Sequence, residues 1–220
     1  MALELVNVSI AVAQRTLLRN LNARVDRGDV LAVMGASGSG KSSLLAWIAG
    51  TLEAPFVASG DVRLDGRSLA TLPIQQRRVG LLFQDDLLFP HMSVRDNLLF
   101  SLPARSGPAS RFEAGERAQR IAAADAALAE AGLEGFGARL PSSLSGGQRS
   151  RVSLLRALLA QPSALLLDEP FSKLDAALRA QMREFTFGTL RRRGVPTVLV
   201  THDEADVPPG AQLIRLDGHA

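Results

Sequence analysis

The most informative part of the sequence is the octapeptide Gly35-Ala36-Ser37-Gly38-Ser39-Gly40-Lys41-Ser42, which fills every position of the phosphate-binding pattern G-x-x-x-x-G-K-S/T. The apolar run before it, residues 30–34, predicts a buried parallel strand, and residues 42–50 predict a helix that ends at Gly50. Glycines let such a loop turn its N–H groups inward, and the helix adds the positive end of its dipole. The octapeptide therefore predicts a site for the phosphates of a nucleotide.

Two side chains of this loop have predicted roles. Lys41 is expected to reach the β- and γ-phosphates, and Ser42, followed by Ser43 in the same cofactor site, carries a hydroxyl that can ligate Mg²⁺. Only two of the 25 basic residues, Lys41 and Lys173, are lysines, and a compact ammonium suits a tight phosphate cradle better than a planar guanidinium. The alternative is a glycine-rich turn with an incidental lysine, which the flanking strand and helix disfavour.

The composition limits the classes of protein to consider. With 220 residues, 46% hydrophobic and 21% charged, the chain can form one large domain, or a domain with a subdomain. No run approaches the about 18 apolar residues that cross a bilayer, and residues 1–7 are no signal peptide, so we expect a soluble chain. The absence of cysteine excludes disulfides and thiolate metal sites and fits the cytoplasm. Basic residues are spread along the chain and aromatics are 5%, which argues against nucleic-acid binding despite a net charge of +3.

Strand and helix patterns alternate along the chain. Apolar runs and alternation predict further strands at residues 3–12, 22–26, 61–64, 79–83, 164–167 and 197–200. Helical patterns are predicted at residues 94–100, 113–131, 148–160 and 175–193, with a breaker segment at 103–108. Strands that alternate with helices predict an α/β fold with a mainly parallel sheet, and ligands bind such sheets at the carboxyl ends of the strands.

A second glycine-rich segment, Leu144-Ser145-Gly146-Gly147-Gln148, opens the helix predicted at 148–160. Its serine is a good N-cap, and its glycines expose backbone amides at a helix N-terminus, where anions bind. Alone it would indicate only a capped helix. Together with the phosphate-binding loop, this LSGGQ segment resembles the signature of the ATP-binding subunit of ABC transporters, and the resemblance covers nearly the whole chain.

The resemblance implies a fold and a domain organisation. The fold is a P-loop NTPase (RecA-like) core with a mainly parallel sheet, an N-terminal antiparallel β layer and an inserted helical subdomain. The whole of residues 1–220 is then one ABC ATPase domain, in which 1–84 and 161–220 form the β layer and core, and about 85–160 form the helical subdomain with the signature motif.

The resemblance also assigns catalytic roles by motif. The apolar strand at 164–167 ends in Asp168, which would hold Mg²⁺, and Glu169, which would polarise the attacking water. His202 matches the switch histidine that bonds the γ-phosphate and helps place Glu169 and the water. Gln84 matches the Q-loop glutamine, whose amide contacts Mg²⁺ or the water. The alternative interpretation is that Asp168 and Glu169 belong to a solvated turn and that His202 has only a structural role.

Three segments relate to partners or to the base. Residues 84–97 are similar to those of importer ATPases for small polar solutes or ions, so the apolar residues at 87–89 are expected to form a docking surface rather than ordinary core. Asp175 matches the D-loop aspartate, although Lys173 stands where a small residue is usual. Val12 aligns with the aromatic residue that stacks on adenine, and no tyrosine is present. We therefore expect weak base stacking and poor selectivity for ATP over GTP.

The combined interpretation is an ATP-binding and ATP-hydrolysing subunit that uses ATP and Mg²⁺ to power solute transport through a separate membrane permease. It would act as a homodimer, closed head to tail by ATP, with each P-loop facing the partner's Ser145, Gly146 and Gly147, and would sit peripherally at the cytoplasmic face of the inner membrane. A solute-binding protein would act through the permease, and no nucleic acid is expected. The alternative is an ABC-type ATPase of DNA maintenance or translation, whose usual long insertions or paired cassettes do not fit in 220 residues. A small-molecule kinase would leave LSGGQ unexplained.

Overall fold

The computed structural model describes residues 2–103 and 114–216, so most of the predicted breaker segment and His219 lie outside the described residues. The chain divides into two compact units, which are described separately. Unit 1 comprises Met1–Gln84, Pro162–Lys173 and Thr186–Ala220, and unit 2 comprises Asp85–Gln161 and Leu174–Phe185. Unit 2 thus includes the first part of the helix predicted at 175–193, which the expected boundaries had given to the core.

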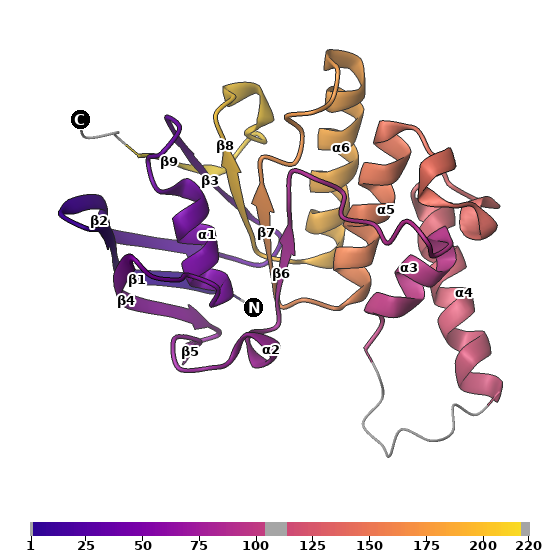
Figure 1. Cartoon of the computed structure of the whole chain (residues 1–220), viewed down its shortest axis with the longest axis horizontal. Helices are drawn as coiled ribbons and strands as arrows, with labels where there is room; N and C mark the ends of the chain where they lie inside the picture. The colour runs from indigo at the N-terminus through magenta and orange to yellow at the C-terminus, as the bar shows by residue number, and fades with distance from the viewer. Residues whose placement is uncertain (1, 104–113, 217–220) are drawn as a thin grey trace. The chain divides into compact units, whose positions relative to one another are not determined.

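The central element of unit 1 is a five-stranded sheet in the order β6-β7-β8-β3-β9, in which every neighbouring pair is parallel (Figure 1). Its strands are β3 (Val30–Gly35), β6 (Val79–Leu82), β7 (Ala164–Asp168), β8 (Thr197–Thr201) and β9 (Gln212–Leu216). The three strands at its centre, β7, β8 and β3, are almost wholly buried. These strands are continuous apolar runs because a parallel sheet is covered on both faces.

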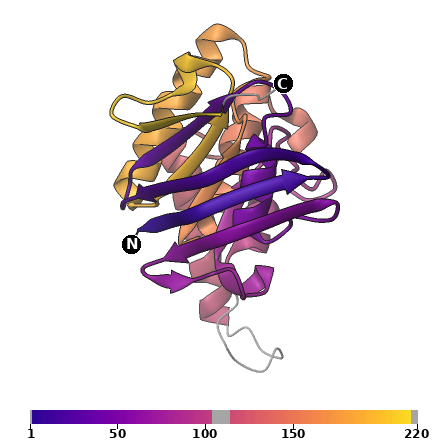
Figure 2. The ribbon, with the colours of Figure 1, turned by 90° about the vertical axis from the view of Figure 1, so that its left-hand side faces the viewer.

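A second sheet of unit 1 is antiparallel, in the order β2-β1-β4-β5 (Figure 2). Its strands are β1 (Leu3–Val12), β2 (Arg15–Val25), β4 (Phe56–Leu64) and β5 (Arg67–Ser68). In β1 the buried residues change phase between Leu5 and Val8, where the register shifts and Asn7 has a φ of +51°. This irregularity keeps Val8 and Ile10 on the buried face despite the odd spacing.

The expected bounds of three strands were wrong. β2 begins at Arg15 rather than at residue 22, β4 begins at Phe56 rather than at residue 61, and β9 was not predicted. All three stretches are rich in exposed residues. β2 and β9 lie at the edges of their sheets, and β4 has one fully buried residue. Edge and one-sided strands lack the continuous apolar run on which the prediction relied.

Helix α1 (Lys41–Ala49) follows β3 through the phosphate-binding loop and ends at Gly50, whose N–H donates to the Ala46 and Trp47 carbonyls. Trp47 is half-buried and packs on the core that both sheets share. Unit 1 also contains α2 (Ile74–Arg77), the short turn η3 (Glu204–Asp206) and the second part of α6 (Ala176–Arg193).

Unit 2 is helical. It contains α3 (Val94–Ser101), α4 (Ala114–Glu130), the turns η1 (Phe136–Ala138) and η2 (Pro141–Ser143), α5 (Gly146–Leu159) and the first part of α6. Its own core is formed by aliphatic side chains such as Leu98, Leu128, Val152 and Leu155. Within residues 2–103 and 114–216, no helix combines the length and the hydropathy needed to span a bilayer.

A buried arginine fixes the far end of α1. The Arg77 guanidinium donates to the carbonyl oxygens of Trp47 and Ile48, both at 2.9 Å, and to those of Leu72 at 3.0 Å and Ala70 at 3.1 Å. Arg77 is 8% exposed, and burial lowers the pKa of its guanidinium from the ordinary value. The cation donates to two carbonyls in the last turn of α1, of which that of Trp47 also accepts from the Gly50 N–H, and it thereby holds the helix that carries the phosphate-binding loop.

Replacing Arg77 by Met should therefore destabilise the chain by about 2–4 kcal/mol, because buried carbonyls lose their donors while the apolar volume is kept. Denaturant unfolding of the purified chain measures the change. The matched control is Arg67→Met on β5, an exposed arginine, for which we expect a change within about 0.5 kcal/mol. Equal effects of the two substitutions would show that the Arg77 contacts contribute nothing specific.

Candidate functional site

The phosphate-binding loop leaves β3 at Gly35 and enters α1 after Gly40, and both positions require glycine. A Cβ on Gly35 would lie 2.6 Å from Ser39 Oγ and 2.8 Å from the Leu216 carbonyl oxygen. Gly40 has a φ of +96°, and its Cβ would lie 2.9 Å from the Leu17 Cβ. Residues of β2 and β9 therefore lie in close contact with the loop, and a larger residue at Gly35 or Gly40 would displace the loop.

Lys41 is the first residue of α1, and its ammonium is drawn into the loop. Its Nζ donates to the carbonyl oxygens of Gly35 and Ala36, both at 2.8 Å, and the residue is 7% exposed. Ser39 closes the loop through its N–H, which donates to the Ala36 carbonyl at 3.2 Å. Its buried hydroxyl has no hydrogen-bond partner among the described residues. The loop thus surrounds a fixed positive charge, as a polyphosphate site needs.

Asp168 lies at the carboxyl end of β7 and faces α1. The Ser42 hydroxyl donates to Asp168 Oδ1 at 3.4 Å, which brings two oxygen ligands of the kind that Mg²⁺ prefers to the mouth of the loop. Burial raises the pKa of the Asp168 carboxyl above the ordinary 3.8. The Ser42 hydrogen bond opposes this rise, the charge of Glu169 adds to it, and the charge of Lys41 opposes it. A cation bound there would relieve the cost of keeping the carboxylate charged.

Glu169 has a strained backbone that sends its side chain away from the line of β7. Its φ is +46°, a conformation that non-glycine residues adopt rarely and at a cost of about 1–3 kcal/mol. Its N–H donates to the Val200 carbonyl at 2.9 Å, and its own carbonyl accepts from the Ser172 N–H and hydroxyl at 3.2 and 2.9 Å. These bonds hold the strained geometry in place.

The Glu169 carboxylate meets His202, which follows β8. Oε2 of Glu169 lies 3.2 Å from Nδ1 of His202, whose side chain is 59% exposed. The turn that carries His202 is fixed by Thr201, whose hydroxyl donates to the buried Asp206 carboxylate at 2.9 Å and accepts from the Asp203 N–H at 3.1 Å. The sequence analysis missed Thr201 and Asp206, because only the folded turn brings them together.

A cavity of about 360 Å³ joins these groups. It contains nine of the residues predicted from the sequence, namely Val12, Ser37, Gly38, Gly40, Lys41, Ser42, Ser43, Glu169 and His202. It adds three that were not predicted, which are Arg15, Leu17 and Phe56. The additions come from the start of β2 and the start of β4, the two strand ends that the sequence analysis did not place.

Gln84 follows β6 and is exposed, and it does not line this cavity. Leu82 of β6 pairs with Leu167 of β7 in parallel register. Gln84 and Glu169 therefore leave the sheet at the same edge, two residues beyond a matched pair. The structure places Gln84 at the edge where the site lies but gives its amide no contact there.

The signature segment belongs to unit 2, where it begins α5. Ser145 and Gln148 form a capping box, in which the Ser145 hydroxyl accepts from the Gln148 N–H at 3.3 Å and the Gln148 side chain accepts from the Ser145 N–H at 2.9 Å. A Cβ on Gly147 would collide with the Leu178 side chain, whereas one on Gly146 would make only an ordinary contact, 3.9 Å from the Arg149 guanidinium. The first glycine thus leaves the helix N-terminus accessible, and the second permits close packing on α6.

Asp175, also in unit 2, precedes α6 and accepts a hydrogen bond from the Leu178 N–H at 3.0 Å. This contact is that of a helix N-cap. The structure thus gives Asp175 a local structural role, while its D-loop role remains a hypothesis.

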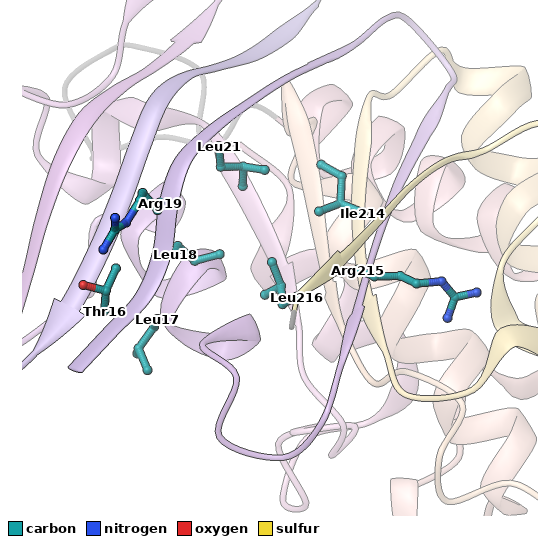
Figure 3. A pocket seen from close by; sticks show the side chains of 8 residues that line it. All are labelled: Thr16, Leu17, Leu18, Arg19, Leu21, Ile214, Arg215 and Leu216. Carbon is teal, nitrogen blue, oxygen red and sulfur yellow. The ribbon is translucent and has the colours of Figure 1, made fainter. Parts of the chain in front are cut away.

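A larger cavity of about 440 Å³ lies elsewhere in unit 1, between the edge strands β2 and β9 (Figure 3). Its walls come from Thr16, Leu17, Leu18, Arg19, Leu21, Ile214, Arg215 and Leu216. Figure 3 shows Leu21 directed toward Ile214, with Arg215 directed away from the leucines. Apart from Thr16, Arg19 and Arg215 the lining is apolar, and it contains neither a carboxylate nor a histidine, so the smaller cavity is the candidate site.

The fold and the smaller cavity define the class of protein. A parallel sheet in which an inner strand, β3, runs into a phosphate-binding loop, with a carboxylate at the end of a nearby strand, is the arrangement of a P-loop NTPase. The profile of the ABC transporter family matches residues 18–172, and the chain belongs to this family. The expected fold class, family and ATPase class are confirmed.

Individual relatives agree. The chain is 47% identical over 211 residues to the uncharacterized ABC transporter ATP-binding protein YnjD of Escherichia coli K12, which covers 96% of this chain and 93% of that protein. It is 44% identical over 189 residues to the sulfate/thiosulfate import ATP-binding protein CysA of Caulobacter vibrioides and 40% identical over 200 residues to that of Synechocystis. These matches cover 86% and 91% of the chain but only 54% and 53% of the import proteins, so the chain spans about half of their length.

Substituting Asp168 by Asn should stabilise the chain at about pH 7 without metal. Because the pKa of Asp168 is raised in the folded state, the folded chain binds this proton more tightly than the unfolded chain. The wild-type carboxyl therefore costs stability above its folded pKa, and the amide removes that cost. We expect a higher Tm at neutral pH and a gain that shrinks as the pH falls toward the ordinary value of Asp.

Thermal unfolding in the presence of a chelator, at neutral and at acidic pH, measures this gain. Asp29→Asn serves as the control, because Asp29 is exposed and its substitution should leave the Tm unchanged at both pH values. A Tm that fell in Asp168→Asn at neutral pH would contradict the burial argument.

Proposed function

We propose that this chain hydrolyses ATP to power the import of a solute through a separate membrane permease. One observation carries the proposal, namely that Lys41 and Ser42 line the same cavity as the Glu169 and His202 pair. Family membership supports the coupling to transport, and the similarity to sulfate/thiosulfate import proteins supports the direction. The solute class that we propose is a small polar molecule or ion, as the similarity of residues 84–97 implies.

The phosphates of ATP would lie on the loop amides and Lys41. Ser42, Asp168 and Gln84 would hold Mg²⁺, which supplies charge that screens the phosphates. The donor set fits this ion, since Mg²⁺ accepts one carboxylate together with phosphate oxygens and waters. Among the described residues no group of three or more His, Cys, Asp or Glu could hold a metal ion by itself. A Mg²⁺ site in which the phosphates of the nucleotide supply the remaining ligands is consistent with both observations.

Glu169 would accept a hydrogen bond from the attacking water and draw its proton as the water oxygen bonds to the γ-phosphorus. The bond from the γ-phosphorus to the β–γ bridging oxygen would break in the same step, so that ADP and phosphate leave. His202 would orient the Glu169 carboxylate through Nδ1 and bond the γ-phosphate through Nε2. A neutral imidazole has one N–H, so donating from both nitrogens requires the imidazolium form. The left-handed backbone of Glu169 supports this role, because strain of this kind is retained where the surrounding bonds fix a functional geometry.

Two copies would close head to tail, each P-loop facing the other chain's Ser145, Gly146 and Gly147. The supporting observation is that Gly146 is loosely surrounded at the N-terminus of the 14-residue helix α5, since a Cβ there would lie 3.9 Å from its nearest neighbour, Arg149. Backbone amides and the helix dipole at such an end favour a phosphate. ATP between two such surfaces would hold the dimer together, and its hydrolysis would release it. Gln148 would act indirectly, through the capping box, and Asp175 would contribute at the same interface.

The permease would dock on unit 2, with the chain held peripherally at the cytoplasmic face of the membrane and a solute-binding protein acting through the permease. Leu87 is 54% exposed and Phe100 is 67% exposed. Phe100 packs edge to face on Phe89, with ring centroids 4.9 Å apart, and Phe89 also faces the Arg156 guanidinium at 5.6 Å. A rigid aromatic pair beside an exposed leucine is suited to anchor a partner helix.

Glu169→Gln should keep ATP binding and abolish hydrolysis, with kcat falling by at least about a hundredfold. The amide keeps the size of the side chain but is a poor base for the water. We expect ATP with Mg²⁺ to trap this variant as a dimer in size-exclusion chromatography. Steady-state turnover provides the second measurement.

The control for this variant is Glu53→Gln, an exposed glutamate that should leave turnover and oligomeric state unchanged. Adding Ser145→Arg to Glu169→Gln should abolish the dimer while each monomer still binds ATP. Wild-type turnover in Glu169→Gln would remove this residue from the reaction, and a dimer that survives Ser145→Arg would remove the signature from the interface.

For the permease, Leu87→Ser combined with Phe100→Ser should reduce recovery of the chain with a multi-span membrane protein by at least about tenfold. The two substitutions remove the apolar surface that the partner would cover. Affinity purification from detergent-solubilised membranes, with identification of the integral subunit, is the measurement. Ile74→Ser is the control, since Ile74 is 51% exposed but lies in unit 1. Equal recovery of all variants would place the docking surface elsewhere.

A further inference from the structure

Val12 stands where an aromatic residue would stack on the base of the nucleotide. The structure gives this valine two neighbours that the sequence did not predict. It is the last residue of β1 and lies directly opposite Arg15 of β2 on one side and Phe56 of β4 on the other. Directly opposed residues of antiparallel strands project from the same face of the sheet, with Cβ atoms about 5 Å apart. Arg15, Val12 and Phe56 therefore form a row across three strands.

The row faces the phosphate-binding loop. All three of its residues line the cavity of about 360 Å³ that also contains Gly38, Lys41 and the other loop residues described above. A nucleotide whose phosphates lie on the loop has the rest of this cavity for its ribose and base. The base end of the cavity is thus bounded by a phenyl ring, a valine and a guanidinium.

We propose, on the basis of the nucleotide site assigned above, that Phe56 with Arg15 holds the base in place of an aromatic residue at position 12. Phe56 is half-buried and packs on the core, so its ring is held in position before the nucleotide arrives. Arg15 is exposed, and a planar guanidinium stacks on π-systems. Val12 fills the space between them.

The same row determines the base preference. A ring and a guanidinium plane recognise the face of a base, and every base has a π-face. Selectivity between ATP and GTP is therefore weak, as the valine at position 12 had already indicated. The affinity for either nucleotide is not weak, however, because the ring missing at position 12 is supplied by Phe56.

The test separates base contacts from phosphate contacts. Isothermal titration of the full chain uses ATP, GTP and inorganic tripolyphosphate, each with Mg²⁺. The variant Phe56→Leu keeps an apolar side chain on the core but removes the ring. We expect it to weaken ATP and GTP binding by about five- to a hundredfold and to leave tripolyphosphate binding unchanged. Arg15→Met, which keeps the aliphatic stem, should produce a smaller loss with the same pattern.

Two further variants sharpen the test. Val12→Tyr added to Phe56→Leu should restore ATP affinity, because it returns a ring to the next position of the same row, whereas a packing defect would not be rescued. Val57→Ala is the control, since Val57 follows Phe56 on β4, is 71% exposed and does not line the cavity. It should bind all three ligands like the wild type.

The possible failures are distinct. If the unmodified chain binds neither ATP nor tripolyphosphate, the nucleotide site itself is wrong. If it binds both, and Phe56→Leu either leaves ATP affinity unchanged or weakens both ligands equally, the row does not hold the base. A preference for ATP over GTP beyond about a hundredfold would also overturn the proposal, because such discrimination requires hydrogen bonds to the edge of the base.

Discussion

The rest of the site depends on the ammonium of Lys41, which joins the end of β3 to the start of α1. Its two bonds to the carbonyls of Gly35 and Ala36 hold the loop in a closed curve around one positive charge. These bonds fix the end of the strand relative to the start of the helix. Because β3 lies between β8 and β9, the position of the loop is fixed by the parallel sheet as a whole.

The reactive groups meet because the strands are parallel. Asp168 ends β7 and Glu169 follows it, His202 follows β8, and the loop follows β3, so that three separate parts of the chain meet at one edge of the sheet. Successive residues of an extended strand place their side chains on opposite faces. Glu169 departs from the extended geometry through its left-handed φ, and its carboxylate lies 3.2 Å from Nδ1 of His202. Asp168 thereby remains with Ser42, and the two acids serve different partners.

Local signals explain what the sequence could predict. The loop, the acids after β7, the signature segment and His202 are contiguous motifs or follow uninterrupted apolar runs, so their positions did not depend on distant pairing. By contrast, β9 has five residues with little buried surface, and its existence depends on pairing with β3, far away in sequence. Phe56 entered the site only through its register with Val12, and Asp206 only through a folded turn. Register and tertiary hydrogen bonds were not accessible to pattern analysis.

The Arg77 contacts have an electrostatic consequence for α1. This helix has nine residues, so it is about 14 Å long, and it carries no basic residue in its own last turn. The guanidinium of Arg77 places a buried cation against its carbonyl end, while the amino end opens on the phosphate-binding loop. The dipole of α1 is therefore neutralised at its negative pole by the protein itself, and its positive pole is left to meet an anion.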